Sequence, residues 1–155
     1  MRLNPATLSP AAYKNYLAFA LTPGTIEAPL RDLVNIRASQ INGCAFCLDM
    51  HVKEATIRGE RALRLHHVAI WKESPLFSPR ERAALRWAEA VTRLGPDGIG
   101  DEDYEAARAA FTEQELSDLT MAVVAINGWN RLNIAFPKTP GSLDAMFGLE
   151  KAGLS

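Results

Sequence analysis

The feature that most constrains the fold is a turn signal between two stretches that are both compatible with a helix. Asn42-Gly43 favours a turn. Residues 27–40 before it are mostly apolar at helical spacing, and Pro29 fits the first turn of a helix, where a missing N–H costs little. Residues 44–58 after it contain neither proline nor glycine. We therefore expect two helices joined at this turn.

The rest of the chain also predicts helices. Ser78-Pro79-Arg80-Glu81 and Thr112-Glu113-Gln114-Glu115 are capping boxes, which mark helix starts. Helices are predicted over residues 11–21, 27–40, 44–58, 60–72, 78–94, 101–110 and 112–136, with a further turn or two over 142–149. No segment shows the sustained alternation of a strand. The prediction is an all-α fold, a compact bundle of about six to eight helices.

Length and charge limit the class of protein. A chain of 155 residues argues for one domain, large enough to bury a core. The 17 basic and 18 acidic residues give a formal net charge of −1 without a basic block, which argues against a nucleic-acid partner. No stretch is apolar for long enough to be a membrane span or a signal peptide. A cytoplasmic protein is the expectation, and cysteine pairs there are more often catalytic or metal-binding than structural.

The two cysteines of the chain follow the turn directly. On a helix, Cys44 and Cys47 lie about 60° apart around the axis with roughly 4.5 Å of rise between them. Their Cα atoms are then about 5 Å apart, which a disulfide permits. His51 stands four residues after Cys47, on the same helix face. The spacing provides a thiol, a second thiol to close on it, and a base, and it indicates redox chemistry.

The expected place of the two thiols in the fold favours their reactive form. A free thiol with a pKa near 8.5 is only about 3% thiolate at pH 7, and the thiolate is the nucleophile. Cys44 and Cys47 are predicted in the first helical turn, where unpaired N–H groups and the helix dipole favour an anion. His51 can exchange a proton with Cys47.

Asp32 is a candidate fourth member of the site. If the two helices run antiparallel, a residue ten before the turn faces one about ten after it, which places Asp32 near the level of His51. An acid on a mostly apolar helix face is costly unless it is paired. The sequence therefore suggests a relay in which Asp32 orients His51 and His51 handles the proton of Cys47.

These residues also carry a family resemblance. Residues 32–47 read Asp32-Leu33-Val34-Asn35-Ile36-Arg37-Ala38-Ser39-Gln40-Ile41-Asn42-Gly43-Cys44-Ala45-Phe46-Cys47, and His51 follows. This stretch, together with Trp71, residues 77–85 and residues 127–133, resembles the alkylhydroperoxidase D-like proteins of the carboxymuconolactone decarboxylase superfamily. The likeness covers roughly residues 25–136, the core of a single domain expected over residues 1–155.

The resemblance implies an all-helical fold that assembles as a homo-trimer or hexamer. It implies reduction of a hydroperoxide substrate without haem or metal, so that no cofactor is expected besides the redox-active Cys44–Cys47 disulfide. In the family, the cysteine that maps to Cys47 attacks the peroxide and the one that maps to Cys44 condenses with it. The reductant would be a dithiol protein, lipoyl-bearing or thioredoxin-like.

The family's histidine maps to His51, and its acid, usually a glutamate twelve residues before the first cysteine, maps to Asp32. Aspartate is one methylene shorter than that glutamate. Some relatives also have a histidine between the cysteines, where this chain has Phe46.

Several other interpretations stay open at this point. The cysteines can be small buried hydrophobes, or zinc ligands together with His51 and Asp32, although zinc sites usually draw on a second ligand cluster. Asp32 can be a solvated helix residue. The alternative functions are a disulfide-exchange or redox-sensing protein with weak peroxidase activity, a lactone decarboxylase-like enzyme, and a non-catalytic interaction protein. Decarboxylation has no use for a closing thiol.

Overall fold

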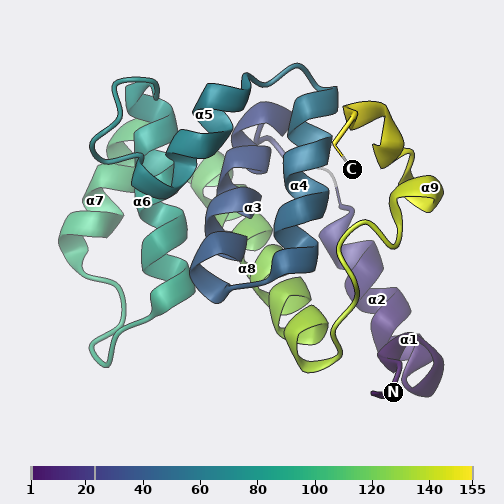
Figure 1. Ribbon diagram of the computed structural model, residues 1–155. Coiled ribbons are helices and arrows are strands. Elements are labelled where there is room, and N and C mark those ends of the chain that lie inside the picture. Colours follow the sequence, from purple (N-terminus) through teal and green to yellow (C-terminus); the bar gives the residue numbers. More distant parts are fainter. Residues whose placement is uncertain (1, 23, 155) are drawn as a thin grey trace.

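The computed structural model describes residues 2–22 and 24–154 (Figure 1). Within these ranges the chain forms nine α-helices and two short 3₁₀ helices, and no strand occurs there. The elements are α1 Pro5–Leu8, α2 Pro10–Ala20, α3 Ala28–Asn42, α4 Ala45–Ile57, α5 Ala62–His67, η1 Val68–Ile70, α6 Pro79–Arg93, α7 Asp101–Ala110, α8 Glu113–Ala135, α9 Asp144–Phe147 and η2 Leu149–Ala152. The all-α prediction is confirmed. None of the helices in the described ranges has the length and apolar character needed to cross a bilayer.

The observed bounds depart most from the predicted ones in residues 60–72. One helix was expected there, and the structure has α5 followed by η1. Leu65, Val68 and Trp71 repeat every three residues and are all buried. Because side chains three apart stack in a 3₁₀ helix, the tighter winding keeps Val68 and Trp71 facing the same core as Leu65.

Both capping boxes form as predicted. The Ser78 hydroxyl accepts from the backbone N–H of Glu81, and the Glu81 carboxylate accepts from the N–H of Ser78 at 2.7 Å. Thr112 and Glu115 make the same reciprocal pair at the start of α8. These caps satisfy N–H groups that a helix start leaves unpaired, and they fix where α6 and α8 begin.

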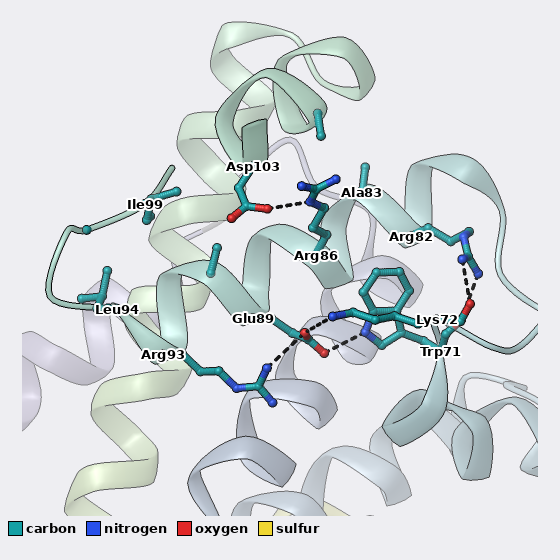
Figure 2. Close-up of a pocket in the computed structure, with 14 residues that line it drawn as sticks. Trp71, Lys72, Arg82, Ala83, Arg86, Glu89, Arg93, Leu94, Ile99 and Asp103 are labelled. Carbon is teal, nitrogen blue, oxygen red and sulfur yellow. Dashed lines mark hydrogen bonds and ion pairs between the residues drawn. The ribbon is translucent and has the colours of Figure 1, made fainter. Parts of the chain in front are cut away.

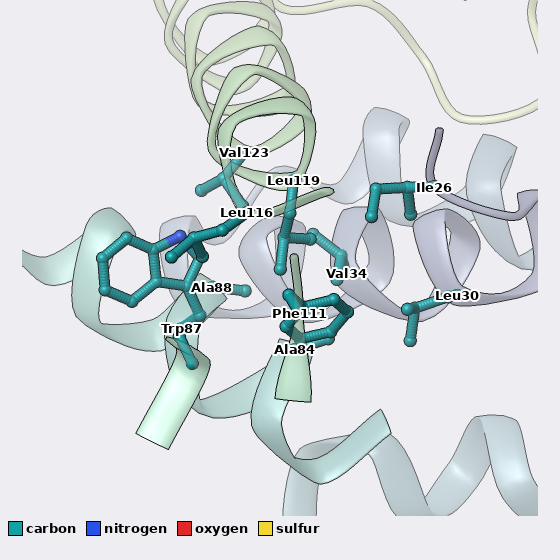
Figure 3. Packing of buried hydrophobic residues seen from close by; sticks show 11 residues of the cluster. Ile26, Leu30, Val34, Ala84, Trp87, Ala88, Phe111, Leu116, Leu119 and Val123 are labelled. Carbon is teal, nitrogen blue, oxygen red and sulfur yellow. The ribbon is translucent and has the colours of Figure 1, made fainter. Parts of the chain in front are cut away.

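Helix α3 is the central element of the bundle. It packs against α4, α6 and α8, and Figure 1 shows it between α6 and α4 with α8 behind. Leu33, Val34 and Ile36 are fully buried, and burying one such side chain contributes about 1.5–3 kcal/mol. Val34 joins a cluster with side chains of α6, of α8 and of the Phe111 turn (Figure 3). This core fixes α3 and, through it, the neighbouring α4.

A buried layer of amide groups ties the end of α3 to α8. The Asn42 side chain donates to the side-chain oxygens of Asn127 at 2.9 Å and Asn130 at 2.8 Å. Asn130 donates to the Ser39 hydroxyl at 3.1 Å, and Asn127 donates to the Thr92 hydroxyl at 2.9 Å. Because buried polar groups are costly when unpaired, this network sets the position of the turn after α3.

Two glycines serve different purposes beside this layer. Gly43 ends α3 with φ 71°, in the left-handed region that favours glycine. Gly128 lies inside α8, where an added Cβ would overlap the phenol group of Tyr16. That close approach lets the Tyr16 hydroxyl donate to the carbonyl oxygen of Ala125 at 2.7 Å. Helix α2 is thereby fastened to α8.

Candidate active site

The α3–α4 hairpin holds the two cysteines at the start of a helix, as the sequence predicted. Cys44 is the N-cap of α4, and its sulfur accepts from the backbone N–H of Cys47 at 3.3 Å. The two residues form a disulfide with their Cα atoms 5.4 Å apart. The predicted ability of this pair to close on itself is therefore confirmed.

The two sulfurs differ in their surroundings. Both residues are buried, Cys44 being 2% exposed and Cys47 1%. Cys47 nevertheless lines a cavity of about 540 Å³, whereas Cys44 is not among the described residues that line it. The side-chain amide of Asn133, from the last turns of α8, donates to the Cys47 sulfur at 3.5 Å. A small molecule in the cavity would therefore meet Cys47 first.

The cavity that Cys47 faces is mostly apolar. It lies between α2, α3, α4, α8 and the segment after α8. The apolar side chains that line it beside the disulfide are Phe46, Met50, Ile126, Trp129 and Leu143. The polar and charged side chains are Tyr13, Thr22, Arg31, Asp32, Asn35, His51, Glu54, Arg58, Asp118, Asn133 and Lys138. Its size suits a small organic ligand.

His51 lies one turn after Cys47 on α4, as predicted; the structure shows that it is buried and that its partner is Glu54. The His51 Nδ1 lies 2.8 Å from Glu54 Oε2. Burial alone would raise the pKa of Glu54, but the hydrogen bond and charge of His51, helped by Arg58 and Arg31, lower it below the ordinary 4.5. Glu54 is therefore ionised at neutral pH. The sequence analysis did not single out Glu54, although it stands three residues after His51, a spacing at which side chains on a helix can interact.

Asp32 lies in the same cavity as His51 but is paired with another residue. Both of its carboxylate oxygens accept from the Arg58 guanidinium, each at 2.6 Å. Asp32 and His51 both line this cavity, but the structure does not give the suggested Asp32–His51 contact. A planar guanidinium binds a buried carboxylate through two parallel hydrogen bonds, and Arg58 stands one turn beyond Glu54. Arg58 also lies 3.7 Å from Glu54.

The zinc interpretation gains no support from this arrangement. Its four ligands were Cys44, Cys47, His51 and Asp32. The two sulfurs are bonded to each other and Asp32 is held by Arg58. Over the described part of the chain, no three histidine, cysteine or acidic side chains converge as a metal-binding group.

The segment after α8 is fastened over the site by Lys53. Its buried ammonium group pairs with Asp49 on its own helix at 3.0 Å and with Asp144 at 2.6 Å. The hydrogen bond with Asp144 raises the pKa of Lys53 against the opposing effect of burial, with Asp49 adding to the rise. This clamp brings Leu143 and Phe147 to the wall of the cavity.

A second cavity, of about 720 Å³, lies on α6 and α7 and contains no cysteine (Figure 2). Its central group is the buried carboxylate of Glu89, which binds Trp71 at 2.8 Å, Lys72 at 3.1 Å and Arg93 at 3.3 Å. Arg37 of α3, whose partner the sequence did not reveal, binds it at 2.7 Å. The charged groups that line this cavity already bind one another or, in the case of Arg82, backbone carbonyl oxygens, so the disulfide remains the candidate site.

The fold and the site define an all-helical protein with a CxxC disulfide at a helix start. Residues 8–90 match the sequence model of the carboxymuconolactone decarboxylase family. The chain is also 40% identical over 111 residues to the uncharacterized protein YdfG of Bacillus subtilis (strain 168), across 72% of this chain and 76% of that protein. The chain therefore belongs to the carboxymuconolactone decarboxylase family.

Solved structures place it among the alkylhydroperoxidase D-like members, as the sequence indicated. A protein of unknown function from Agrobacterium tumefaciens, named as a candidate antioxidant defence protein AhpD, superposes with a TM-score of 0.84 and 39% identity. That match covers 90% of this chain and 97% of the other. An uncharacterized peroxidase-related protein with an AhpD core, from Ralstonia eutropha JMP134, shares the fold with a TM-score of 0.75 at 22% identity, over 88% and 74% of the two chains.

Proposed function

We propose that this protein is a thiol-dependent reductase of organic hydroperoxides. The observation that supports this most strongly is the position of the disulfide. Cys47 borders a mostly apolar cavity with His51 one turn away, whereas its disulfide partner Cys44 is not among the described residues that line this cavity. The kinship with the candidate AhpD protein of Agrobacterium tumefaciens points to the same chemistry.

The proposed reaction begins with the reduced pair. The Cys47 thiolate attacks the terminal oxygen of the hydroperoxide, the O–O bond breaks, and Cys47 becomes a sulfenic acid. His51 passes the thiol proton to the departing alkoxide, which leaves as an alcohol. Cys44 then attacks the Cys47 sulfur, releasing water and forming the disulfide. An external dithiol supplies the two electrons and two protons that restore the reduced pair.

The cavity favours an organic hydroperoxide over hydrogen peroxide as the substrate. Phe46, Met50 and Trp129 can pack against an alkyl or aryl group, a contact that hydrogen peroxide cannot make. Family kinship suggests a lipoyl-bearing or thioredoxin-like protein as the dithiol reductant, and a homo-trimer or hexamer as the assembly.

Two alternative functions carry less weight. A disulfide-exchange protein would use the same pair of cysteines, but it would have no use for the mostly apolar cavity that Cys47 borders. A decarboxylase would leave the disulfide without a role. The ratio of hydroperoxide reduction to reduction of a protein disulfide separates the exchange function from the proposed one.

A single-turnover reaction tests the proposal. Fully reduced protein mixed with one equivalent of cumene hydroperoxide is expected to release one equivalent of the alcohol, to lose its two free thiols, and to lose about 2 Da in mass. Hydrogen peroxide should react more slowly. Protein with both cysteines alkylated is the control. Unconsumed hydroperoxide beside intact thiols in the unmodified protein would refute the proposal.

A further inference from the structure

The carboxylate that touches His51 comes from the histidine's own helix. Glu54 Oε2 lies 2.8 Å from His51 Nδ1, and the two residues are three positions apart on the face of α4 that borders the cavity. The His51 side chain is 11% exposed and that of Glu54 31%. In this contact the His51 side chain is therefore shielded from solvent, whereas the Glu54 side chain is partly exposed to it.

Both oxygens of Asp32 bind Arg58 instead of His51. Its Oδ1 and Oδ2 each accept from a different nitrogen of Arg58 at 2.6 Å. The same guanidinium lies 3.7 Å from Glu54 Oε2. The four side chains therefore form a series in which Asp32 contacts Arg58, Arg58 approaches Glu54, and Glu54 contacts His51.

From this series the structure assigns to Glu54 the role of positioning residue for His51, and to Asp32 an indirect role exerted through Arg58. The assignment rests on the proposed function for its chemistry. It differs from the sequence interpretation, in which the acid on α3 orients the histidine directly. In this chain that acid binds Arg58, and an acid on α4 orients the ring.

The contact defines what Glu54 does to the imidazole. An ionised carboxylate can only accept, so the hydrogen between the two groups belongs to Nδ1 of His51. Nε2 is then left as the acceptor, free to take the proton of Cys47. When the ring becomes positively charged, the Glu54 carboxylate stabilises it, and the charged ring stabilises the Cys47 thiolate.

Other charged groups around the cavity also act on this proton equilibrium. They are Arg31 and Asp32 on α3, Arg58 at the C-cap of α4, Asp118 on α8, and Lys138 in the segment after α8. Of these, Arg58 and Arg31 act on Glu54 itself, since both help to lower its pKa. The experiment must therefore compare Glu54 with another charge of the same cavity, and Asp32 is the matched choice.

The test follows ionisation of the Cys47 thiol in a Cys44→Ser background, where Cys47 is the only thiol. Thiolate absorbance and the rate of alkylation are measured from pH 5 to 10. Glu54→Gln is expected to raise the pH of half-ionisation by about half a unit to one unit and to slow hydroperoxide reduction at pH 7 about tenfold. Glu105→Gln, which removes an exposed charge on α7, is expected to change neither.

A double variant tests the indirect role of Asp32. Asp32→Asn alone should raise the pH of half-ionisation of Cys47 by less than Glu54→Gln does. It releases Arg58, which then moves toward Glu54 and weakens the contact of Glu54 with His51. Added to Glu54→Gln, it should produce no further shift beyond about 0.2 units. Circular dichroism confirms that each variant is folded.

Two results would overturn the inference. One is a pH of half-ionisation of Cys47 that is unchanged in Glu54→Gln. The other is a shift caused by Asp32→Asn that has the same size whether Glu54 is present or replaced by Gln. These readouts need no peroxide. A protein that fails to reduce hydroperoxides but keeps the Glu54 shift would therefore disprove the proposed function and not this assignment.

Discussion

Cys47→Ser is expected to abolish peroxide-dependent oxidation of a dithiol, with a loss of about 10³-fold or more in rate. The serine hydroxyl fits the same space but stays protonated at neutral pH, so no nucleophile faces the cavity. Cys44 cannot substitute, because it is buried and is not among the described residues that border the cavity. The rate is measured as hydroperoxide-dependent consumption of dithiothreitol.

The matched control is Cys44→Ser, which removes the other sulfur of the same pair. It should still react once with hydroperoxide at a rate close to that of wild type, because the first step uses only Cys47. Equal rates for Cys47→Ser and wild type would contradict the assignment of the attacking sulfur.

Glu89→Leu is expected to lower the free energy of unfolding by about 3–5 kcal/mol, because it leaves the largely buried side chain of Arg37 without its counter-charge. The Trp71 indole N–H loses its acceptor as well. The corresponding drop in Tm is roughly 10 °C. Urea unfolding followed by circular dichroism measures the difference.

The double variant Arg37→Met with Glu89→Leu is the control, since it removes both buried charges. It should recover most of the lost stability. A double variant as unstable as Glu89→Leu alone would show that Arg37 is not the cause.

The Glu89 effect should also depend on pH in a defined direction. Burial would raise the pKa of Glu89, but hydrogen bonds from Trp71, Arg37 and Lys72 lower it below its ordinary 4.5. A carboxylate whose pKa is lower in the folded than in the unfolded state stabilises the protein at any pH above its unfolded-state pKa. This stabilisation is lost as the pH falls through the folded-state pKa. The gap in stability between wild type and Glu89→Leu should therefore be fully present at pH 7 and shrink below about pH 4.5.

The sequence predicted helix boundaries well where they are set by contacts between residues within one helical turn of each other. The capping boxes at Ser78 and Thr112, the left-handed Gly43, and the CxxC spacing each involve atoms a few residues apart. The rule that relates them is therefore the same in any helical protein. For this reason the fold class, the hairpin and the disulfide were predictable.

The pairing of charged side chains was not predictable in the same way. Counting residues back from the turn brought Asp32 to the level of His51, but which partner it takes depends on how α3 and α4 are rotated about their axes. Arg58 offers two donors in one plane and binds it instead. Glu89 as the partner of Arg37 joins α6 to α3 across 52 residues, and no local pattern indicates that pair.

The clamp of Lys53 on Asp144 was hidden for the same reason. The partners come from α4 and from the segment after α8, 91 residues apart in the sequence. The sequence suggested only a turn or two of helix in that segment, and nothing in it indicated that Leu143 and Phe147 would cover the site.

The central claim is that hydroperoxide oxidises the sulfur of Cys47. Trapping the sulfenic acid that forms there tests this claim most directly. Reduced Cys44→Ser protein is treated with one equivalent of cumene hydroperoxide in the presence of dimedone, and its peptides are analysed by mass spectrometry. A dimedone adduct on Cys47, approaching one per chain and matched by one equivalent of released alcohol, is the expected result. Hydroperoxide that is consumed without a Cys47 adduct, or that stays intact while the Cys47 thiol remains free, would contradict the claim.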